Sequence, residues 1–263
     1  MADGVVHFVG AGPGDPELIT VRGRRLLETA DLVIYAGSLV PEAVLQWTRD
    51  NARRLNSAGM ALADIVDAMV AAHRRGERVV RLHTGDPSLY GAIFEQMVLL
   101  DAAGVAYAVT PGVTAAFAAA AALQMEYTLP ERCQTLILTR MAGRTPVPET
   151  ESLASLASHR AAMAIYLSMG QVSSVAEILS DAYGPQAPCA VAYRVSHPDE
   201  KLVCCRLADL AERAAAEGIT RQALILVGAA LGARNAGDAA PSRLYDPGFS
   251  HGFRKGTGDA DTP

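Results

Sequence analysis

Aromatic side chains and excess positive charge are both scarce in this sequence. Aromatic residues make up 5% of the 263 residues, and the formal net charge is −5 because 28 Asp and Glu outnumber 23 Lys and Arg. The basic residues form no block longer than two. Nucleic-acid binding through phosphate-binding cations and stacking rings is therefore disfavoured, and we expect no nucleic-acid partner.

Long apolar runs are missing as well. A membrane-spanning helix needs about 18 or more consecutive apolar residues, whereas the nearest candidate, Val113–Leu123, is shorter and rich in Ala. The first residues include an acid, Asp3, and show neither the basic nor the apolar region of a signal peptide. We therefore expect a cytoplasmic protein with no membrane partner.

Cysteine is also rare. The four cysteines, Cys133, Cys189, Cys204 and Cys205, form no CxxC or Cys/His metal motif, and two of them are direct neighbours. A cytosolic chain keeps such thiols reduced. The sequence thus predicts neither a disulfide framework nor a metal site.

Hydrophobic residues, in contrast, make up half of the chain, whose length suits two domains of ordinary size. In the first half, apolar β-branched runs alternate with helical patterns, and this βαβ order predicts a parallel sheet. The expected strands are Val5–Val9, Leu32–Tyr35, Val79–His83 and Ala106–Thr110, with a weaker strand at Arg53–Asn56. The expected helices are Leu18–Ala30, Leu62–Arg75 and Tyr90–Ala103.

The second half has a different pattern. Two runs flank residues 196–200 as in a β-hairpin with a longer loop, which requires antiparallel pairing and so predicts a mixed sheet. The expected strands are Thr135–Thr139, Ala164–Ser168, Cys189–Val195, Leu202–Arg206 and Leu224–Gly228. The expected helices lie near Ser152–Ser158, Val172–Ala182 and Leu207–Gly218.

Domain limits follow from the breaks in these patterns. The run Thr110-Pro111-Gly112 ends a strand and precedes a helix of small residues, so we expect an α/β domain over residues 1–111 and a second over 112–232. From about residue 233 to 263 the composition turns to Gly, Ala, Pro, Asp and Arg without a period, which predicts an extended tail.

A glycine-rich turn, Gly10-Ala11-Gly12-Pro13-Gly14-Asp15-Pro16, follows the first strand and precedes a helix. Its glycines let backbone approach a ligand closely, and the helix start offers free N–H groups. The spacing is not the Gly-x-Gly-x-x-Gly of a dinucleotide site, and the two prolines remove N–H groups. The pattern alone fits a structural turn equally well.

Two more loops follow strand ends. Residues 84–91 read Thr-Gly-Asp-Pro-Ser-Leu-Tyr-Gly, and Asp86 could accept hydrogen bonds from a sugar or an amino group or could simply form a turn. Residues 111–116 read Pro-Gly-Val-Thr-Ala-Ala, and their small side chains would let an adenine or a ribose lie against backbone or would merely start a helix.

Taken together, in this order and at these separations, the three loops resemble those of the tetrapyrrole methylases, over about residues 5–228. The resemblance implies two α/β domains with S-adenosylmethionine held in the cleft between them, and a homodimer. It assigns cofactor contacts to Pro13, Gly85, Asp86, Pro87, Tyr90, Thr114, Ala115, Met169, Ala192 and Tyr193. Met169 could instead fill core.

Departures within the family indicate a substrate. Methylases of uroporphyrinogen carry an Asp after the second strand and a Lys after the third, whereas this chain has Ala36 and the run Asn56-Ser57-Ala58. Its Ala36-Gly37-Ser38-Leu39 step resembles instead the branch that methylates C-11 of precorrin-4 or of cobalt-precorrin-4. On this resemblance the tetrapyrrole is bound by Gly12, Gly14, Ser38, Arg132 and Arg194.

The chemistry implied by the resemblance needs little from the protein beyond orientation. A sulfonium methyl group is already activated, and correct alignment can supply roughly 7–11 kcal/mol. We assign no catalytic base. His83, Arg140 and Arg254 are further candidates for carboxylate binding. The alternatives are another corrin-ring C-methyltransferase of the same family, a non-catalytic tetrapyrrole carrier and, least favoured by the glycine spacing, a nucleotide-dependent oxidoreductase.

Overall fold

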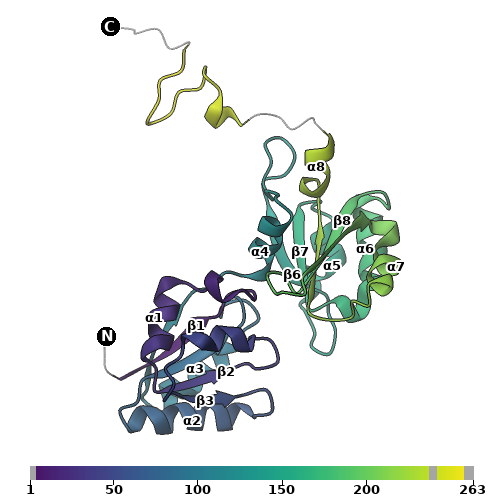
Figure 1. Ribbon diagram of the computed structural model, residues 1–263. Helices are drawn as coiled ribbons and strands as arrows, with labels where there is room; N and C mark the ends of the chain where they lie inside the picture. The colour runs from purple at the N-terminus through teal and green to yellow at the C-terminus, as the bar shows by residue number, and fades with distance from the viewer. Residues whose placement is uncertain (1–3, 237–241, 258–263) are drawn as a thin grey trace. The chain divides into compact units, whose positions relative to one another are not determined.

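The computed structural model describes residues 4–236 and 242–257, which form two compact α/β units (Figure 1). The first unit comprises Met1–Ala119 together with Arg194–Glu200. The second comprises Ala120–Tyr193 and Lys201–Pro263. A short loop from late in the sequence therefore belongs to the first unit, although the strands on either side of it belong to the second.

The first unit contains a five-stranded parallel sheet in the order β3-β2-β4-β1-β5, which confirms the expected parallel sheet. Its strands are β1 (Val5–Gly10), β2 (Leu32–Tyr35), β3 (Arg53–Asn56), β4 (Val79–His83) and β5 (Ala106–Thr110). Because all five run in the same direction, their carboxyl ends share one edge of the sheet. The three loops singled out in the sequence follow β1, β4 and β5, which are neighbours.

Helices pack against both faces of this sheet. They are η1 (Pro16–Leu18), α1 (Val21–Thr29), η2 (Glu42–Trp47), α2 (Leu62–Arg74) and α3 (Ile93–Ala102). Helix α4 (Ala115–Ala122) follows β5 and spans the boundary between the units at Ala119. One face forms a core with Phe8 and Met69, and the other forms a core with Val9 and Leu27. The helix expected from Leu18 starts three residues later, because the Thr20 side chain caps α1 by accepting a hydrogen bond from Gly23 N (3.0 Å).

The second unit contains a mixed sheet in the order β6-β7-β10-β8-β9, as expected. Its strands are β6 (Leu136–Arg140), β7 (Ala162–Tyr166), β8 (Pro188–Tyr193), β9 (Lys201–Arg206) and β10 (Ala223–Val227). β6 and β7 are parallel, and the other three pairings are antiparallel. The pairing of β8 with β9 confirms the hairpin around residues 196–200.

The helices of the second unit surround a core that includes Met163, Ile165 and Leu179. They are α5 (Leu153–Ala157), η4 (Met169–Gln171), α6 (Val172–Tyr183), η5 (Leu207–Asp209) and α7 (Leu210–Ala216). The second unit also contains η3 (Glu149–Glu151), α8 (Ala230–Ala236) and η6 (Arg243–Tyr245). Helix α8 continues past the point where periodicity ends, since its run of Ala and Leu favours helix without an amphipathic pattern. Within the expected tail, residues 242–257 are described and include η6, whereas residues 237–241 and 258–263 lie outside the described residues.

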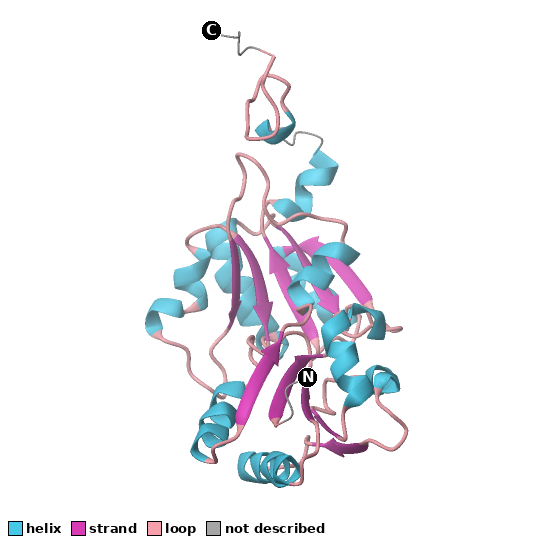
Figure 2. Cartoon of the chain, turned by 90° about the vertical axis from the view of Figure 1, so that its left-hand side faces the viewer, coloured by secondary structure: helices cyan, strands magenta, loops and turns pink. Residues whose placement is uncertain are grey.

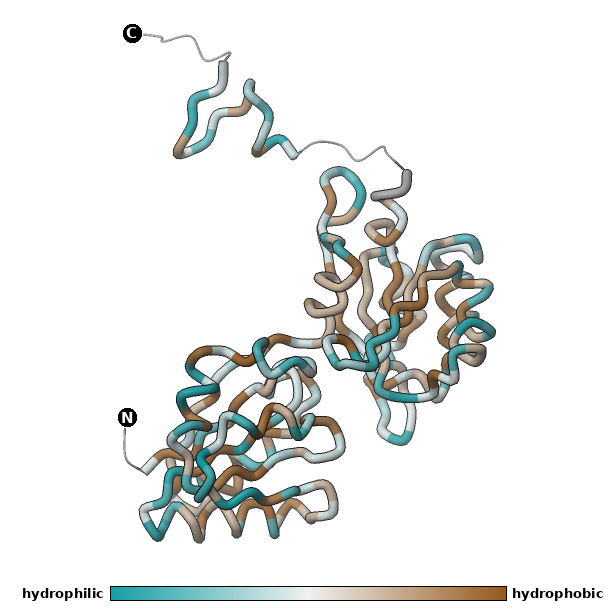
Figure 3. The backbone as a smooth tube through the Cα atoms, in the orientation of Figure 1, coloured by the Kyte–Doolittle hydropathy of each residue, from teal (hydrophilic) through white to brown (hydrophobic). Residues whose placement is uncertain are grey.

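The layering within each unit is visible in two further views. Figure 2 shows helices flanking the strands of each sheet. Figure 3 shows hydrophobic residues running along the strands and hydrophilic residues gathering in the connecting loops. Across the two described ranges, no helix combines the length and hydropathy that a membrane crossing requires.

Candidate functional site

The three loops that follow β1, β4 and β5 meet at three glycines. A Cβ atom on Gly10 would lie 2.6 Å from both the Gly85 carbonyl oxygen and Gly112 Cα, and one on Gly112 would lie 2.1 Å from the same Gly85 oxygen. These distances are too short for any side chain. The loops are therefore packed backbone to backbone at the carboxyl edge of the first sheet.

Hydrogen bonds extend this contact along the first two loops. Gly85 N donates to Gly12 O (2.8 Å), Gly12 N donates to Gly85 O (3.3 Å), and Ala11 N donates to His83 O (2.7 Å). Gly12 and Gly85 both have positive φ, 81° and 60°. The glycine-rich turn after β1 thus continues as a short antiparallel bridge to the Gly-Asp-Pro turn.

Asp86 links the second loop to the third. Its Oδ2 accepts a hydrogen bond from Gly112 N (2.9 Å), and its Oδ1 accepts bonds from Ser88 N (2.8 Å) and from the Ser88 hydroxyl. Burial alone would raise the pKa of Asp86, but the hydrogen bonds from Ser88 and Gly112 outweigh it and hold the pKa below its ordinary value. The ionised carboxylate therefore fixes the shape of two loops.

The end of the second loop is strained. Tyr90 and Ala92 have positive φ values of 56° and 49°, and a Cβ on Gly91 would lie 2.1 Å from the Pro87 carbonyl oxygen. A left-handed conformation is unusual for a bulky residue, and such strain clusters at functional sites. Tyr90 lies in the same loop as Asp86, and its side chain is 44% exposed. The sequence predicts that both residues contact the cofactor.

Residues 194–200, the loop between β8 and β9, complete the site of the first unit. Ser196 Oγ accepts a hydrogen bond from Asp15 N (3.0 Å), and a Cβ on Gly14 would lie 2.4 Å from the His197 ring. His197 also hydrogen-bonds to the carbonyl of Pro13. This loop therefore holds the glycine-rich turn from a second side.

Arg194, predicted to bind a substrate carboxylate, has protein partners in this loop. Its Nε donates to Asp199 Oδ1 (2.7 Å), and its Nη2 lies 3.3 Å from His197 Nδ1. Burial and the positive charge of Arg194 together lower the pKa of His197, so the ring is neutral at pH 7. Neither His197 nor Ser196 was a candidate from sequence, because a hairpin loop gives no local sign that it packs on a distant turn.

The second unit places its predicted cofactor residues at one edge of its own sheet. β7 and β8 both run antiparallel to β10, so their carboxyl ends lie at the same edge. Met169 and Ala192 are buried there, and Tyr193 is half-buried. Leu167, which no sequence pattern singles out, is 70% exposed with a φ of 53°, and this strain marks it as a further candidate.

The remaining predicted polar residues are more dispersed. Ser38 is exposed in the loop after β2 of the first unit, and Arg132 is exposed in a turn of the second. Arg140 donates to the carbonyls of Thr145 (3.1 Å) and Pro146 (2.7 Å). Arg254 donates to the carbonyls of Leu244 (2.8 Å) and Asp246 (2.6 Å). Arg140 and Arg254 thus shape their own loops, and their role as carboxylate ligands stays a prediction.

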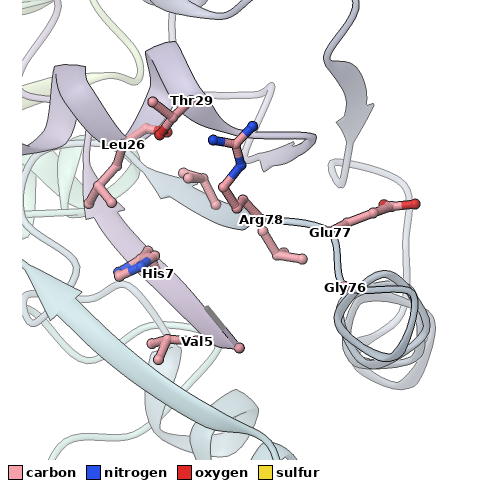
Figure 4. A pocket seen from close by; sticks show the side chains of 10 residues that line it. Val5, His7, Leu26, Thr29, Gly76, Glu77 and Arg78 are labelled. Carbon is pink, nitrogen blue, oxygen red and sulfur yellow. The ribbon is translucent and has the colours of Figure 1, made fainter. Parts of the chain in front are cut away.

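A separate pocket lies at the opposite, amino edge of the first sheet (Figure 4). It is lined by Val5, His7, Leu26, Thr29 and Arg78, together with neighbours from the starts of β1 and β4. None of the predicted site residues lines it. Open parallel sheets bind ligands at their carboxyl ends, so the glycine loops remain the candidate site. No cluster of three His, Cys, Asp or Glu able to hold a metal occurs within residues 4–236 and 242–257.

Comparison with known proteins identifies the family of this chain. The tetrapyrrole (corrin/porphyrin) methylase family matches residues 5–211. A cobalt-precorrin-4 C(11)-methyltransferase of Methanocaldococcus jannaschii is 50% identical over 251 residues, covering 95% of this chain and 96% of the relative. A precorrin-4 C(11)-methyltransferase of Pseudomonas aeruginosa is 48% identical, covering 95% and 99%.

Solved structures show the same fold. The X-ray structure of a cobalt precorrin-4 methyltransferase, a cobalamin biosynthetic enzyme, aligns with a TM-score of 0.84 at 47% identity, covering 86% of this chain and 95% of the other. A uroporphyrin-III C-methyltransferase from Thermus thermophilus, complexed with S-adenosylhomocysteine, aligns with a TM-score of 0.69 at 29% identity, covering 86% and 92%. With its parallel and mixed sheets and its three glycine loops, the chain belongs to the tetrapyrrole methylase family.

Proposed function

We propose that this protein transfers a methyl group from S-adenosylmethionine to C-11 of precorrin-4, or of its cobalt-containing form, during corrin ring synthesis. The observation that carries the proposal is the packing of Gly10, Gly85 and Gly112, which joins the family's three loops into one surface. The relatives about half identical to this chain carry that activity in their names. The proposed substrate is thus a tetrapyrrole that bears several carboxylates.

The residues present fit the proposed cofactor. Gly85, Asp86, Pro87 and Tyr90 share one loop, and Thr114 and Ala115 follow the next strand end, so the two groups adjoin through the bond between Asp86 and Gly112 N. The ideal Cβ position of Gly85 is 3.7 Å from Thr114 Cα, which leaves ordinary contact space beside the loop. When bound, S-adenosylmethionine would supply an electrophilic methyl group.

The chain's own residues act by positioning. The Asp86 carboxylate keeps the Gly-Asp-Pro turn and the Pro-Gly corner in register, and His197 with Ser196 holds the glycine-rich turn that would face the macrocycle. Rigid placement of both reactants supplies much of the rate enhancement when the methyl group is already activated. The absence of an acid at Ala36 is compatible with methylation of a substituted ring carbon, which has no C–H proton to remove.

Turnover assays test this function. Purified protein is incubated with S-adenosylmethionine and either metal-free or cobalt-loaded precorrin-4, and the macrocycle mass is followed. We expect a gain of one methyl group, with the faster reaction identifying the natural substrate form. Methylation of another corrin precursor alone would indicate a different ring C-methyltransferase. Tight binding of both ligands without any turnover would indicate a carrier.

We further propose a homodimer. Support comes from an apolar surface of the first unit that includes the edge strand β5 and helix α3, where Phe94 is 72%, Val98 48% and Val109 41% exposed. Exposed apolar patches and open sheet edges are common sites of self-association. Light scattering on the purified protein should give twice the mass of one chain, and Phe94→Glu should lower it, whereas a monomeric wild type would refute the proposal.

We also propose that the protein works in the cytoplasm, with S-adenosylmethionine and the tetrapyrrole as its partners. The support is that Cys133, Cys189, Cys204 and Cys205 are free thiols, even though the sulfurs of Cys189 and Cys205 lie 3.4 Å apart. Such a pair stays reduced in the cytosol and would be prone to oxidation outside it. Cell fractionation with an antibody to the native chain tests this location.

A further inference from the structure

Arg81 is an unusual residue at the centre of the first sheet. It lies in β4, the middle strand, and is only 5% exposed. Its guanidinium donates to Gln96 Oε1 (3.0 Å), to Ser57 Oγ (3.0 Å) and to the carbonyl of Ile34 (3.3 Å). All three acceptors are neutral, and no carboxylate of the described residues forms an ion pair with Arg81.

A buried cation without a counterion is costly, and arginines this deeply buried are ordinarily paired. Burial lowers the pKa of Arg81 to about 10, which still leaves the side chain protonated at pH 7. His83, on the same face of β4, adds no charge, because burial and the nearby Arg81 lower its pKa to about 3. The interior of the first unit thus retains one full positive charge.

The neutral partners of Arg81 lead to the loops of the candidate site. Ser57 follows β3 and also donates its hydroxyl to the carbonyl of Tyr35, the last residue of β2. Gln96 also donates to the carbonyl of Ala92, where the strained Gly-Asp-Pro loop ends and α3 begins. Arg81 therefore lies beneath the carboxyl edge of the sheet. Its hydrogen-bond partners come from β2, from the loop after β3 and from α3.

The loops above Arg81 contain no other cation. Residues 11–20, 36–41, 57–61, 84–92 and 111–114, which follow the five strands, include the acids Asp15, Glu17 and Asp86 but no Lys or Arg. Arg194, in the later loop that joins this unit, is paired with Asp199. The acids in these loops would oppose the binding of a ligand with several carboxylates, and a positive charge beneath the loops would offset that effect.

We propose that Arg81 is a positioning residue that supplies this charge, and that the carboxylates of the bound macrocycle are its missing counterions. The inference rests on the proposed function for the identity of the ligand. Because the charge is buried among neutral groups, water and salt screen it less than they would a surface arginine. The charge of Arg81 acts on the ligand across the intervening loops, and Arg81 takes no part in the methyl transfer itself.

A compensating variant tests the charge while keeping the arginine. Gln96→Glu places a carboxylate on the Arg81 Nε and neutralises it, whereas Gln96→Met removes the same hydrogen bonds without adding charge. We expect Gln96→Glu to weaken macrocycle binding about tenfold, in both KM and the calorimetric Kd, with kcat and the Kd for S-adenosylhomocysteine within about twofold. Gln96→Met should leave the macrocycle Kd within about twofold.

Substitution of Arg81 itself provides the second test. Arg81→Lys keeps the charge and should bind precorrin-4 nearly as well as wild type, whereas Arg81→Gln should match Gln96→Glu. Arg74→Gln, an exposed arginine at the end of α2 near the amino edge, removes the same charge and serves as the control. If Arg81→Gln does not fold, the pair of Gln96 variants decides.

Two results would overturn the proposal. One is an unchanged macrocycle Kd in folded Gln96→Glu, and the other is an equal loss in Gln96→Glu and Gln96→Met, which would mean that Arg81 only supports the fold. The proposed function is judged separately, by whether wild-type protein methylates precorrin-4. The ratios of macrocycle Kd among the variants test the role of Arg81 even if the wild-type protein does not methylate precorrin-4.

Discussion

The two ends of the parallel sheet in the first unit differ in how their charged side chains are paired. At the amino edge, Asp31 pairs with Arg78 (3.0 Å) and Arg49, and Glu77 pairs with Arg75 (2.7 Å) and Arg53. Below the carboxyl edge, in the middle of β4, Arg81 has only neutral partners. The charged groups named at the amino edge are paired within the protein, whereas Arg81, below the carboxyl edge, is the charge that we propose is paired by the ligand.

Backbone geometry shows the same division. The carboxyl edge contains the left-handed non-glycine residues Tyr90 and Ala92 and the glycine contacts that tolerate no side chain, whereas the positive φ values before β1 and β4 at the amino edge belong to glycines, Gly4 and Gly76. Strained and close-packed backbone persists only where the surrounding structure enforces it. The comparison indicates that the carboxyl edge is shaped for binding and the amino edge for stability.

The largest effect is expected at the glycine contact. Gly112→Ala would place a Cβ 2.1 Å from the Gly85 carbonyl oxygen, so the two loops must separate. We expect loss of methyl transfer by at least about a hundredfold, because misplacement of reactants by about 1 Å is costly. Gly59→Ala, at a glycine with no neighbour within 4 Å, is the matched control and should retain full activity.

Removal of the Asp86 carboxylate should have the next largest effect. Asp86→Ala frees Gly112 N and Ser88, and we expect cofactor affinity, measured by calorimetry with S-adenosylhomocysteine, to fall about tenfold, as for loss of hydrogen bonds to a charged group. The effect should be reproduced in wild type as the pH falls through the lowered pKa of Asp86, because protonation removes the acceptor charge. Unchanged affinity in Asp86→Ala would contradict the placement of the cofactor.

A smaller effect is expected at His197. Its ring fills the space above Gly14 and bonds to the Pro13 carbonyl, so His197→Ala loosens the glycine-rich turn without touching the loop of Asp86. We predict a rise of about threefold to tenfold in the KM for the macrocycle, consistent with loss of about 1 kcal/mol of hydrogen bonding, with cofactor affinity retained. An equal loss for both ligands would show that the two loops cannot be separated in this way.

At the amino edge, in contrast, we expect a substitution to change the stability of the protein and not its activity. Asp31→Asn should cost about 1 kcal/mol of unfolding free energy at pH 7, given a partly exposed network of two arginines. The hydrogen bonds from Arg78 hold the pKa of Asp31 far below its ordinary value. The contribution is therefore complete above about pH 4 and is lost as pH falls further, so melting curves of the two proteins should converge in acid.

Much of this comparison was accessible from sequence. The runs at Val79–His83 and Leu32–Tyr35 are rich in Val, Leu and Ile, residues that favour extended structure in a sheet, and both form strands as expected. The three glycine loops were also found, since Gly, Pro and Asp have strong local preferences that hold in any context. Starts of helices were less certain, because capping by Thr20 depends on a side-chain bond that a hydrophobic pattern does not record.

Features that arise from distant contacts were not accessible. Arg81 lies in a run, Val-Val-Arg-Leu-His, in which alternation would place it facing solvent, and only the assembled sheet shows its burial against Gln96. The packing of His197 on Gly14 joins residues more than 180 positions apart, and the pairing of Arg194 with Asp199 depends on how the loop between β8 and β9 folds. Local preferences carry no signal for such contacts.

Hydrogen exchange with bound S-adenosylhomocysteine tests the division between the two edges most directly. The account predicts that peptides covering residues 84–92 and 111–116 exchange more slowly with the ligand, while those covering residues 29–31 and 75–79 are unchanged. Slowing confined to the amino edge, around the pocket of His7 and Arg78, would contradict it.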